Sequence, residues 1–355
     1  MARPEERRKK PIMRVPVASV NGQPLMPTTP QRARTLLRAG IAEKRWNKLG
    51  QFYIQMRQDI ASNRQGLCLA VDTGSKWDGV AVLSTIGVIT SSMLVLPLGV
   101  AERLDRRRMI RRARRHRKTR RRPQRFDNRR KPEGWLAPSQ KAKVDFRIRI
   151  VDELCKIYPA TQFAVEDVHF NKYKRRWTRH ANTAEQGKTM FYRHLRKLGR
   201  LTLYDGFETA EFRKSLKLQK NGVKRELTWD THAIDAIAIG CNDIGCVNPY
   251  PQEFWVWRRS QPPRRQLQRI QPRKGGNRVR YGGTWSIPPF KKGDVVQYRG
   301  GLARVGGFRD GLISLHNFDL DNERFTTRAK PDECKRLFNQ RVFSKYERLQ
   351  LILPP

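Results

Sequence analysis

The sequence predicts a mixed α/β (α+β) protein: an α/β domain split by an arginine-rich helix, a small N-terminal domain and a small β-barrel-like C-terminal domain. Three observations lead to this fold class. Residues 66–100 hold three apolar, alternating segments, GLCLAVDTG, DGVAVLST and GVITSSMLVLP. A dense basic block spans 103–131, and beyond about 247 Gly, Pro, Trp and Arg dominate. Three alternating segments joined by tight turns predict an antiparallel meander.

The N-terminal unit, residues 1–62, begins with a short extended segment, MRVPVASV. Asn21-Gly22 lies between apolar stretches and is a turn signal. A helix-like stretch, TPQRARTLLRAGIAEKRW, follows, with Leu36, Leu37 and Ile41 on one side. We therefore expect a short strand, a turn and a helix here.

After the basic block, segments with the apolar period of a helix alternate with short apolar runs typical of strands. Residues 139–157, 183–199 and 231–244 are expected to be helices, whereas TQFAVEDV and LTLYDGF are expected to be strands. The segment KKGDVVQYRGGLARVGGFRDGLISLHNFD alternates between Gly turns, which is typical of a small β-barrel.

The basic block contains 17 Lys or Arg among the 29 residues Arg103–Lys131. Arg favours helix, and Pro123 is expected to end or kink a helix that runs to about Arg122. Basic side chains on every face cannot pack on a protein core, and like charges at i,i+4 repel. A disordered basic segment is the alternative. We favour a helix surrounded by phosphates.

The whole chain is also very basic. Its 355 residues include 75 Lys or Arg and 32 Asp or Glu, a net charge of +43 with a pI of about 11. This charge argues against a small-molecule enzyme or a secreted binding module, and it predicts a nucleic-acid partner. The sequence shows no membrane-spanning run or secretory signal, and its five scattered Cys favour reduced thiols in a cytoplasm-like compartment.

Three acids stand out because apolar residues precede or surround them. Asp72 ends CLAVD, Glu166 ends FAVE, and Asp235 lies within THAIDAIAIG three residues after His232. On one helix, positions i and i+3 share a face, so His232 and Asp235 are expected to point the same way. Carboxylates that converge in a partly buried place favour Mg²⁺ or Mn²⁺, and we expect a pair of ions that acts on a phosphodiester.

Each of these residues also has a simpler interpretation. Asp72 fits a turn, because Asp-Thr-Gly is turn-prone, and Glu166 fits a solvated strand end. His232 fits the start of a helix. Asp235 is hardest to explain in this way, because an unpaired acid among Ala and Ile costs several kcal/mol. Together the residues favour a metal site.

The same residues resemble a known family. LAVDTGSKWDGVAV, AVEDVHF and HAIDAIAIG are similar to the three motifs of a RuvC-type nuclease, which has an RNase H-like fold. An arginine-rich bridge helix between the first two motifs resembles the RNA-guided relatives of that fold. NGQPLMPTTPQRARTLL resembles the PLMP segment that opens IscB and IsrB proteins. Only 68 residues separate Glu166 from Asp235, too few for the HNH nuclease of IscB, so the chain resembles IsrB.

The resemblance implies a division of the chain. It places the PLMP domain at 1–62, RuvC part I at 63–100, the bridge helix at 101–131 and RuvC part II at 132–170. A linker with RuvC part III then covers 171–247. Residues 248–355 become a candidate target-adjacent-motif-interacting domain.

The resemblance also implies roles. Such a protein binds omega RNA, whose guide pairs with one DNA strand, and nicks the displaced strand beside a short adjacent motif. Asp72, Glu166 and Asp235 would be the metal ligands, and His232 would assist proton transfer or position the scissile phosphate. The bridge arginines would bind RNA: Arg106, Arg107, Arg111, Arg112, Arg114, Arg115, Arg117 and Arg121. An unguided, junction-resolving nuclease and a non-catalytic RNA-binding protein are the alternatives.

Overall fold

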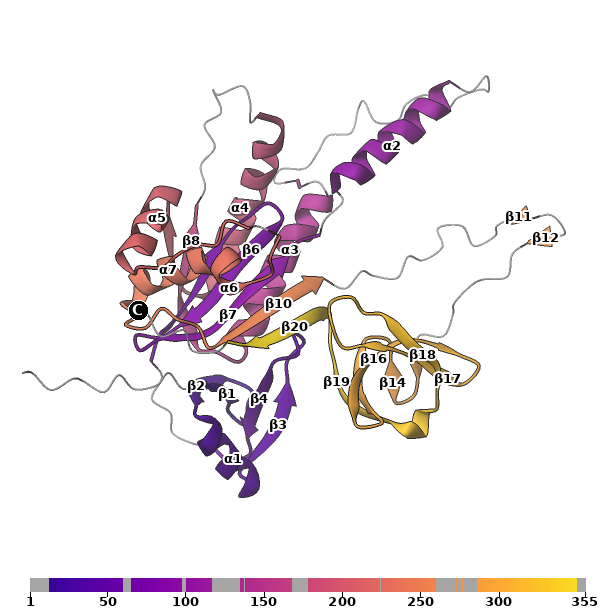
Figure 1. Ribbon diagram of the computed structural model, residues 1–355, viewed down its shortest axis with the longest axis horizontal. Helices are drawn as coiled ribbons and strands as arrows, with labels where there is room; N and C mark the ends of the chain where they lie inside the picture. The colour runs from indigo at the N-terminus through magenta and orange to yellow at the C-terminus, as the bar shows by residue number, and fades with distance from the viewer. Residues whose placement is uncertain are drawn as a thin grey trace, which may run out of the picture.

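A computed structural model of the chain describes residues 13–59, 65–97, 100–116, 135–136, 138–167, 178–223, 225–259, 272–273, 276–277 and 286–349. Three units can be followed in Figure 1: a small N-terminal sheet, a central sheet covered by helices, and a C-terminal β unit. Among the helices described, none is both long and apolar enough to cross a membrane.

The N-terminal unit is a four-stranded sheet in the order β2-β1-β4-β3 with one helix. Its elements are β1 (Val15–Ala18), β2 (Pro24–Thr28), α1 (Pro30–Arg38), β3 (Ala42–Trp46) and β4 (Phe52–Met56). The predicted helix over 29–46 is therefore wrong in its second half. Gly40 has φ +70°, a left-handed conformation that ends a helix, and the chain turns into β3.

The central sheet has seven strands in the order β20-β10-β7-β6-β5-β8-β9. They are β5 (Leu67–Asp72), β6 (Trp77–Leu83), β7 (Val88–Val95), β8 (Ala160–Glu166), β9 (Arg200–Tyr204), β10 (Glu253–Arg259) and β20 (Val342–Arg348). β6 is antiparallel to both β5 and β7, as the predicted meander requires, whereas β8 is parallel to β5 and β9 to β8. This arrangement confirms the mixed α/β class and fits the RNase H-like fold.

Helices cover both faces of the central sheet (Figure 1). They are α3 (Pro138–Cys155), α4 (Thr178–Leu198), α5 (Gly206–Ser215), α6 (Trp229–His232) and α7 (Ile234–Ile244), whereas α2 (Val100–Arg115) extends away from the sheet. Leu69 and Val71 of β5 join the core under α3 and α4, whereas Cys68 and Ala70 join the core under α7. This alternation follows from the two-residue period of a strand, and it decides which face each acid occupies.

The C-terminal β unit is inserted between β10 and β20. Its antiparallel sheet has the order β18-β17-β16-β15-β19 and curls into a small barrel-like shape (Figure 1). Its elements are β11 (Pro272–Arg273), β12 (Gly276–Asn277), β13 (Ser286–Ile287), β14 (Phe290–Lys291), β15 (Asp294–Tyr298), β16 (Gly301–Arg309), β17 (Leu312–Asn317), β18 (Arg324–Ala329), the 3₁₀ turn η1 (Pro331–Glu333) and β19 (Cys334–Asn339).

The structure corrects the expected domain of residues 248–355 at both of its ends. β10 is parallel to β7 and antiparallel to β20, so both strands belong to the central sheet. Phe254, Val256 and Trp257 of β10 are buried in the cores of that sheet. Burial of these side chains fixes the pairing of β10, and the two strands anchor the C-terminal β unit.

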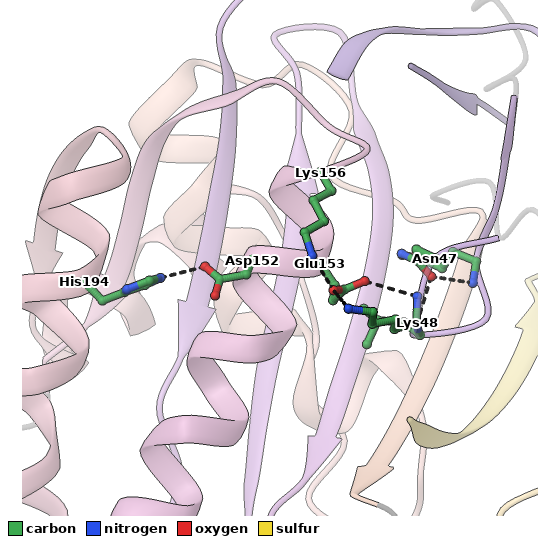
Figure 2. Close-up of polar contacts among 8 residues, drawn as sticks. Asn47, Lys48, Asp152, Glu153, Lys156 and His194 are labelled. Carbon is green, nitrogen blue, oxygen red and sulfur yellow. Dashed lines mark hydrogen bonds and ion pairs between the residues drawn. The ribbon is translucent and has the colours of Figure 1, made fainter. Parts of the chain in front are cut away.

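The loop between β3 and β4 contacts both other units, and Figure 2 shows its contact with α3. The backbone N–H of Lys48 donates to Glu153 of α3 at 3.1 Å, and Lys156 donates to the same carboxylate at 2.6 Å. On the other side of the loop, the Gln340 amide donates to the Leu49 carbonyl at 3.0 Å. Leu49 itself is fully buried in the core under α3. The loop therefore ties the N-terminal unit to both other units.

Candidate metal-binding site

Two of the predicted acids end neighbouring parallel strands. Asp72 is the last residue of β5 and Glu166 the last residue of β8, and Val71 lies opposite Val165 in the register. Parallel strands bring their carboxyl ends to the same edge of a sheet. By alternation, both acids lie on the face that α7 covers, because Ala70 and Ala164 belong to the core beneath α7.

The third acid reaches the same edge from a helix. Asp235 lies in the first turn of α7, which packs against β5, β6 and β8. One carboxylate oxygen from each of Asp72, Glu166 and Asp235 can be chosen so that all three lie within 4.8 Å of one another. The structure thus brings together the three acids that the sequence singled out. The helix N-terminus adds a positive field that favours negative charge there.

The crowding of these acids has an electrostatic cost. The pKa of Asp72 is raised well above its ordinary value, chiefly by burial and then by the neighbouring Glu166 and Asp235. Lys220 acts in the opposite direction and favours the ionised form of Asp72. Three hard oxygen donors that repel one another form a donor set suited to a divalent cation such as Mg²⁺ or Mn²⁺.

His232 lies three residues before Asp235, the third member of the acidic trio Asp72, Glu166 and Asp235, but the two residues are on different helices. α6 ends at His232, and α7 begins at Ile234 after a break at Ala233. The expected single helix is thus two, which corrects the assumption of one shared helical face. The His232 ring packs against Trp77, with ring centroids 5.0 Å apart. It is not one of the three grouped ligands.

Glycine at position 79 allows this close approach. Gly79 lies opposite Asp72 in the β5–β6 pairing. A Cβ at Gly79 would lie 2.0 Å from the carbonyl oxygen of His232, a distance that real structures do not contain. The backbone of α6 can therefore rest on β6 only because residue 79 has no side chain.

Two cations that sequence reasoning missed contact Asp235. Arg213 of α5 lies with its Nε 2.7 Å from Oδ1, and Lys220 forms an ion pair and a hydrogen bond with Oδ2. α5 was not predicted, although its capping box was a readable signal: Asp205 accepts from Glu208 N–H, and the Glu208 carboxylate accepts from Asp205 N–H. No local pattern links either cation to Asp235, because packing of α5 on α7 creates the contact.

A buried ion pair holds the turn that follows Asp72. Arg147 of α3 donates to both oxygens of Asp78, at 2.7 and 2.8 Å, and to the Gly74 carbonyl at 2.7 Å. Asp78 in turn accepts from the Gly74 N–H at 2.8 Å. Thr73 of this turn donates to the Glu166 carbonyl at 3.2 Å. The turn therefore connects Asp72 to both α3 and the end of β8, and Asp78 has a structural role.

The second strand end is held in a similar way. Asp167, which follows Glu166, forms an ion pair with Lys188 of α4 and accepts a hydrogen bond from Tyr192 at 3.0 Å. Its N–H donates to the Tyr204 carbonyl at 2.6 Å. Asp167 is therefore a structural acid that fixes the end of β8.

The basic helix α2 is described as far as Arg115, short of the predicted end near Arg122. It extends away from the central sheet (Figure 1). The side chains of Arg106, Arg112 and Arg115 are exposed. Arg107, Arg111 and Arg114 lie on the helix but their side chains are not described, and Arg117 and Arg121 lie outside the described residues.

Comparisons with known proteins bear on the first half of the chain. The model of a family described as RRXRR protein matches residues 15–187, which include Asp72, Glu166 and α2 but not Asp235. Residues 111–115 of this chain read Arg-Arg-Ala-Arg-Arg. No curated protein matches the chain.

Two solved structures show a weak similarity to about half of this chain. One is Thermus thermophilus RuvC in complex with a Holliday junction substrate, at 13% identity and a TM-score of 0.31, covering 51% of this chain and 97% of that one. The other is a structure of Thermus thermophilus RuvC, at 14% identity and a TM-score of 0.30, covering 50% and 96%. The fold assignment rests on the strand order described above.

Proposed function

We propose that this protein is an RNA-guided, metal-dependent DNA nickase of the IsrB type. The observation that carries the proposal is the convergence of Asp72, Glu166 and Asp235 at one edge of the central sheet. The arginine-rich α2 lies between the first two of these acids in sequence, and exposed arginines on it offer counter-charge to nucleic-acid phosphates. The RRXRR family, found in IscB and other OMEGA-type proteins, supports the same assignment.

In this proposal, Asp72, Glu166 and Asp235 hold one or two Mg²⁺ or Mn²⁺ ions. Their fit rests on the donor set itself: carboxylate oxygens, crowded within 4.8 Å, with the pKa of Asp72 raised by burial and by the other two acids. The bound ions would activate water and stabilise the leaving oxygen of a phosphodiester. β5, β8 and α7 supply rigid positions for the three carboxylates, and Arg147 and Asp167 support the two strand ends.

The remaining roles follow from the same fold. His232, three residues before Asp235 in the chain, would take a proton from the attacking water or position the scissile phosphate. The arginines of α2 would bind the phosphates of omega RNA, whose guide pairs with the target strand. The C-terminal β unit is our candidate for contact with a short motif in the adjacent duplex. Among the described residues one such group of acids is found, and one nuclease site would cut one strand, in this proposal the displaced strand.

The test is to purify the protein with its RNA, sequence that RNA and offer a supercoiled plasmid that carries a complementary site. We expect Mg²⁺-dependent conversion to the nicked form, with the break on one strand. Asp72→Asn and Asp235→Asn should lower the rate by about two orders of magnitude or more. Asp145→Asn is the matched control, because Asp145 is an exposed acid on α3.

Each outcome separates the proposal from its alternatives. Unchanged nicking in both site variants would refute the metal site. Activity on branched DNA after complete removal of RNA would favour an unguided nuclease. Tight RNA binding with no nicking under any divalent cation would favour a non-catalytic RNA-binding protein.

A further inference from the structure

A protein cation lies beside each oxygen of the Asp235 carboxylate. Arg213 pairs with Oδ1 and Lys220 with Oδ2, while Asp235 itself is only 8% exposed at its side chain. A carboxylate that ligates a dication must present an oxygen to it, and a fixed ammonium group on that oxygen would repel the ion. One of the two contacts must therefore open when an ion enters.

Lys220 is the cation placed to leave. Its side chain is 37% exposed, compared with 24% for Arg213. Lys220 pairs with a carboxylate that has an oxygen within 4.8 Å of oxygens of Asp72 and Glu166, so its ammonium group lies beside all three acids. Arg213 belongs to α5, which packs on α7, and its planar guanidinium is less easily moved.

The position of Lys220 in the chain suits a group that moves. It lies on the segment between α5 and α6, on a flexible four-carbon stem. The next residue, Asn221, is anchored by its N–H, which donates to the Asp230 carbonyl at 3.2 Å. The backbone is thus held beside the site, and rotation about the side-chain bonds of Lys220 is what can move its ammonium group away from Asp235.

We propose that Lys220 is a displaceable counter-ion, which occupies the Asp235 carboxylate until a divalent cation enters and then turns toward the phosphate of the bound nucleic acid. This inference rests on the proposed function, because it assumes that the trio binds the metal. Before entry, Lys220 offsets the repulsion among the acids. After the ion has entered, the carboxylates no longer need the charge of Lys220, and its ammonium group can pair with a phosphate of the bound nucleic acid.

The role predicts an unusual effect on metal binding. Lys220→Met should bind Mn²⁺ more tightly than the wild type, because the competing ammonium group is gone. Removing the partly exposed ion pair between Lys220 and Asp235 corresponds to about a fivefold increase in affinity for Mn²⁺. A lysine that only stabilised the folded site would have the opposite effect, since its loss would loosen the ligands.

The experiment measures bound Mn²⁺ by electron paramagnetic resonance during titration of the full-length protein with its RNA. The double variant Asp72→Asn/Glu166→Gln gives the background of Mn²⁺ bound elsewhere. Lys220→Arg retains the charge and should bind Mn²⁺ as the wild type does. Lys214→Met is the matched control, because it removes an exposed positive charge near the end of α5.

Tighter binding in Lys220→Met alone supports the proposal. Trio-dependent binding that is unchanged or weaker in Lys220→Met refutes the role of Lys220 and leaves the proposed metal site standing. An equal increase in Mn²⁺ affinity in Lys214→Met also refutes it, because the loss of one positive charge anywhere near the site would then be the cause. Wild-type binding no greater than in the double variant would refute both the metal site and this inference.

Discussion

Replacing Asp78 by asparagine is expected to destabilise the central domain more than loss of any exposed ion pair. The Asp78 side chain is fully buried and that of Arg147 is 9% exposed. Burial alone would lower the pKa of Arg147, but the neighbouring Asp78 outweighs burial and the pKa is raised. In Asp78→Asn, the guanidinium stays buried without a full counter-charge.

The expected magnitude follows from the contacts. Breaking a buried pair by removing one partner costs about 3–5 kcal/mol. Asparagine keeps one carbonyl oxygen and can accept one of the two Arg147 hydrogen bonds, so we expect a loss near the lower end, about 3 kcal/mol. For a domain of this size, that loss lowers the melting temperature by about 6–12 °C.

The assay is thermal unfolding followed by tryptophan fluorescence at fixed pH and salt. Asp105→Asn is the matched control: the pair Arg108–Asp105 spans 3.4 Å with side chains 68% and 64% exposed, and its loss should cost under about 1 kcal/mol. A shift in Asp78→Asn no larger than in the control would refute the reasoning. Asp78→Asn should also weaken Mn²⁺ binding, because the turn after Asp72 is released.

Three further predictions concern pH, packing and RNA binding. Burial raises the pKa of Glu253 to about 7 from 4.5, so its contribution to folding stability is present below pH 4.5 and is lost as pH rises through 7. In unfolding experiments, Glu253→Gln should therefore be more stable than the wild type by about 3 kcal/mol at pH 8 and as stable as the wild type at pH 4. Gly79→Ala should lower stability by about 1–3 kcal/mol and weaken Mn²⁺ binding measured by titration, because its Cβ would meet a backbone carbonyl of α6 at 2.0 Å. Replacing Arg106, Arg112 and Arg115 together by glutamine should reduce the slope of log affinity against log salt for RNA by about 2–3, and an unchanged slope would mean that α2 does not contact phosphates.

The sequence was sufficient to single out the three acids that the structure brings together. Asp72 and Glu166 each end an apolar run, and the two-residue period of a strand fixes the face on which each lies. Asp235 was conspicuous because apolar residues surround it. These signals are local, so a single chain read without its structure reveals them.

The groups that support the acids were not predictable in this way. Arg147 and Asp78 are 69 positions apart, and their contact exists only because α3 packs beneath β6. Arg213 reaches Asp235 through the packing of α5 on α7, and Lys220 reaches it from the segment that follows α5. The local pattern of β10 likewise indicates a strand but not its neighbour, so the boundary of the C-terminal unit was placed too early.

The insertion of the C-terminal β unit between β10 and β20 has a mechanical consequence for the proposed nickase. β10 pairs with β7, and the loop between β3 and β4 is held by Glu153 on one side and Gln340 on the other. Among the described residues, both adjoining units therefore contact the loop that packs on the sheet carrying the acids. If the C-terminal unit reads duplex DNA, these contacts would set the distance between the motif that it contacts and the position of the nick. Lengthening the chain at the β19–β20 junction should then broaden the distribution of nick positions on a sequencing gel, whereas a unit that only binds RNA would leave that distribution unchanged.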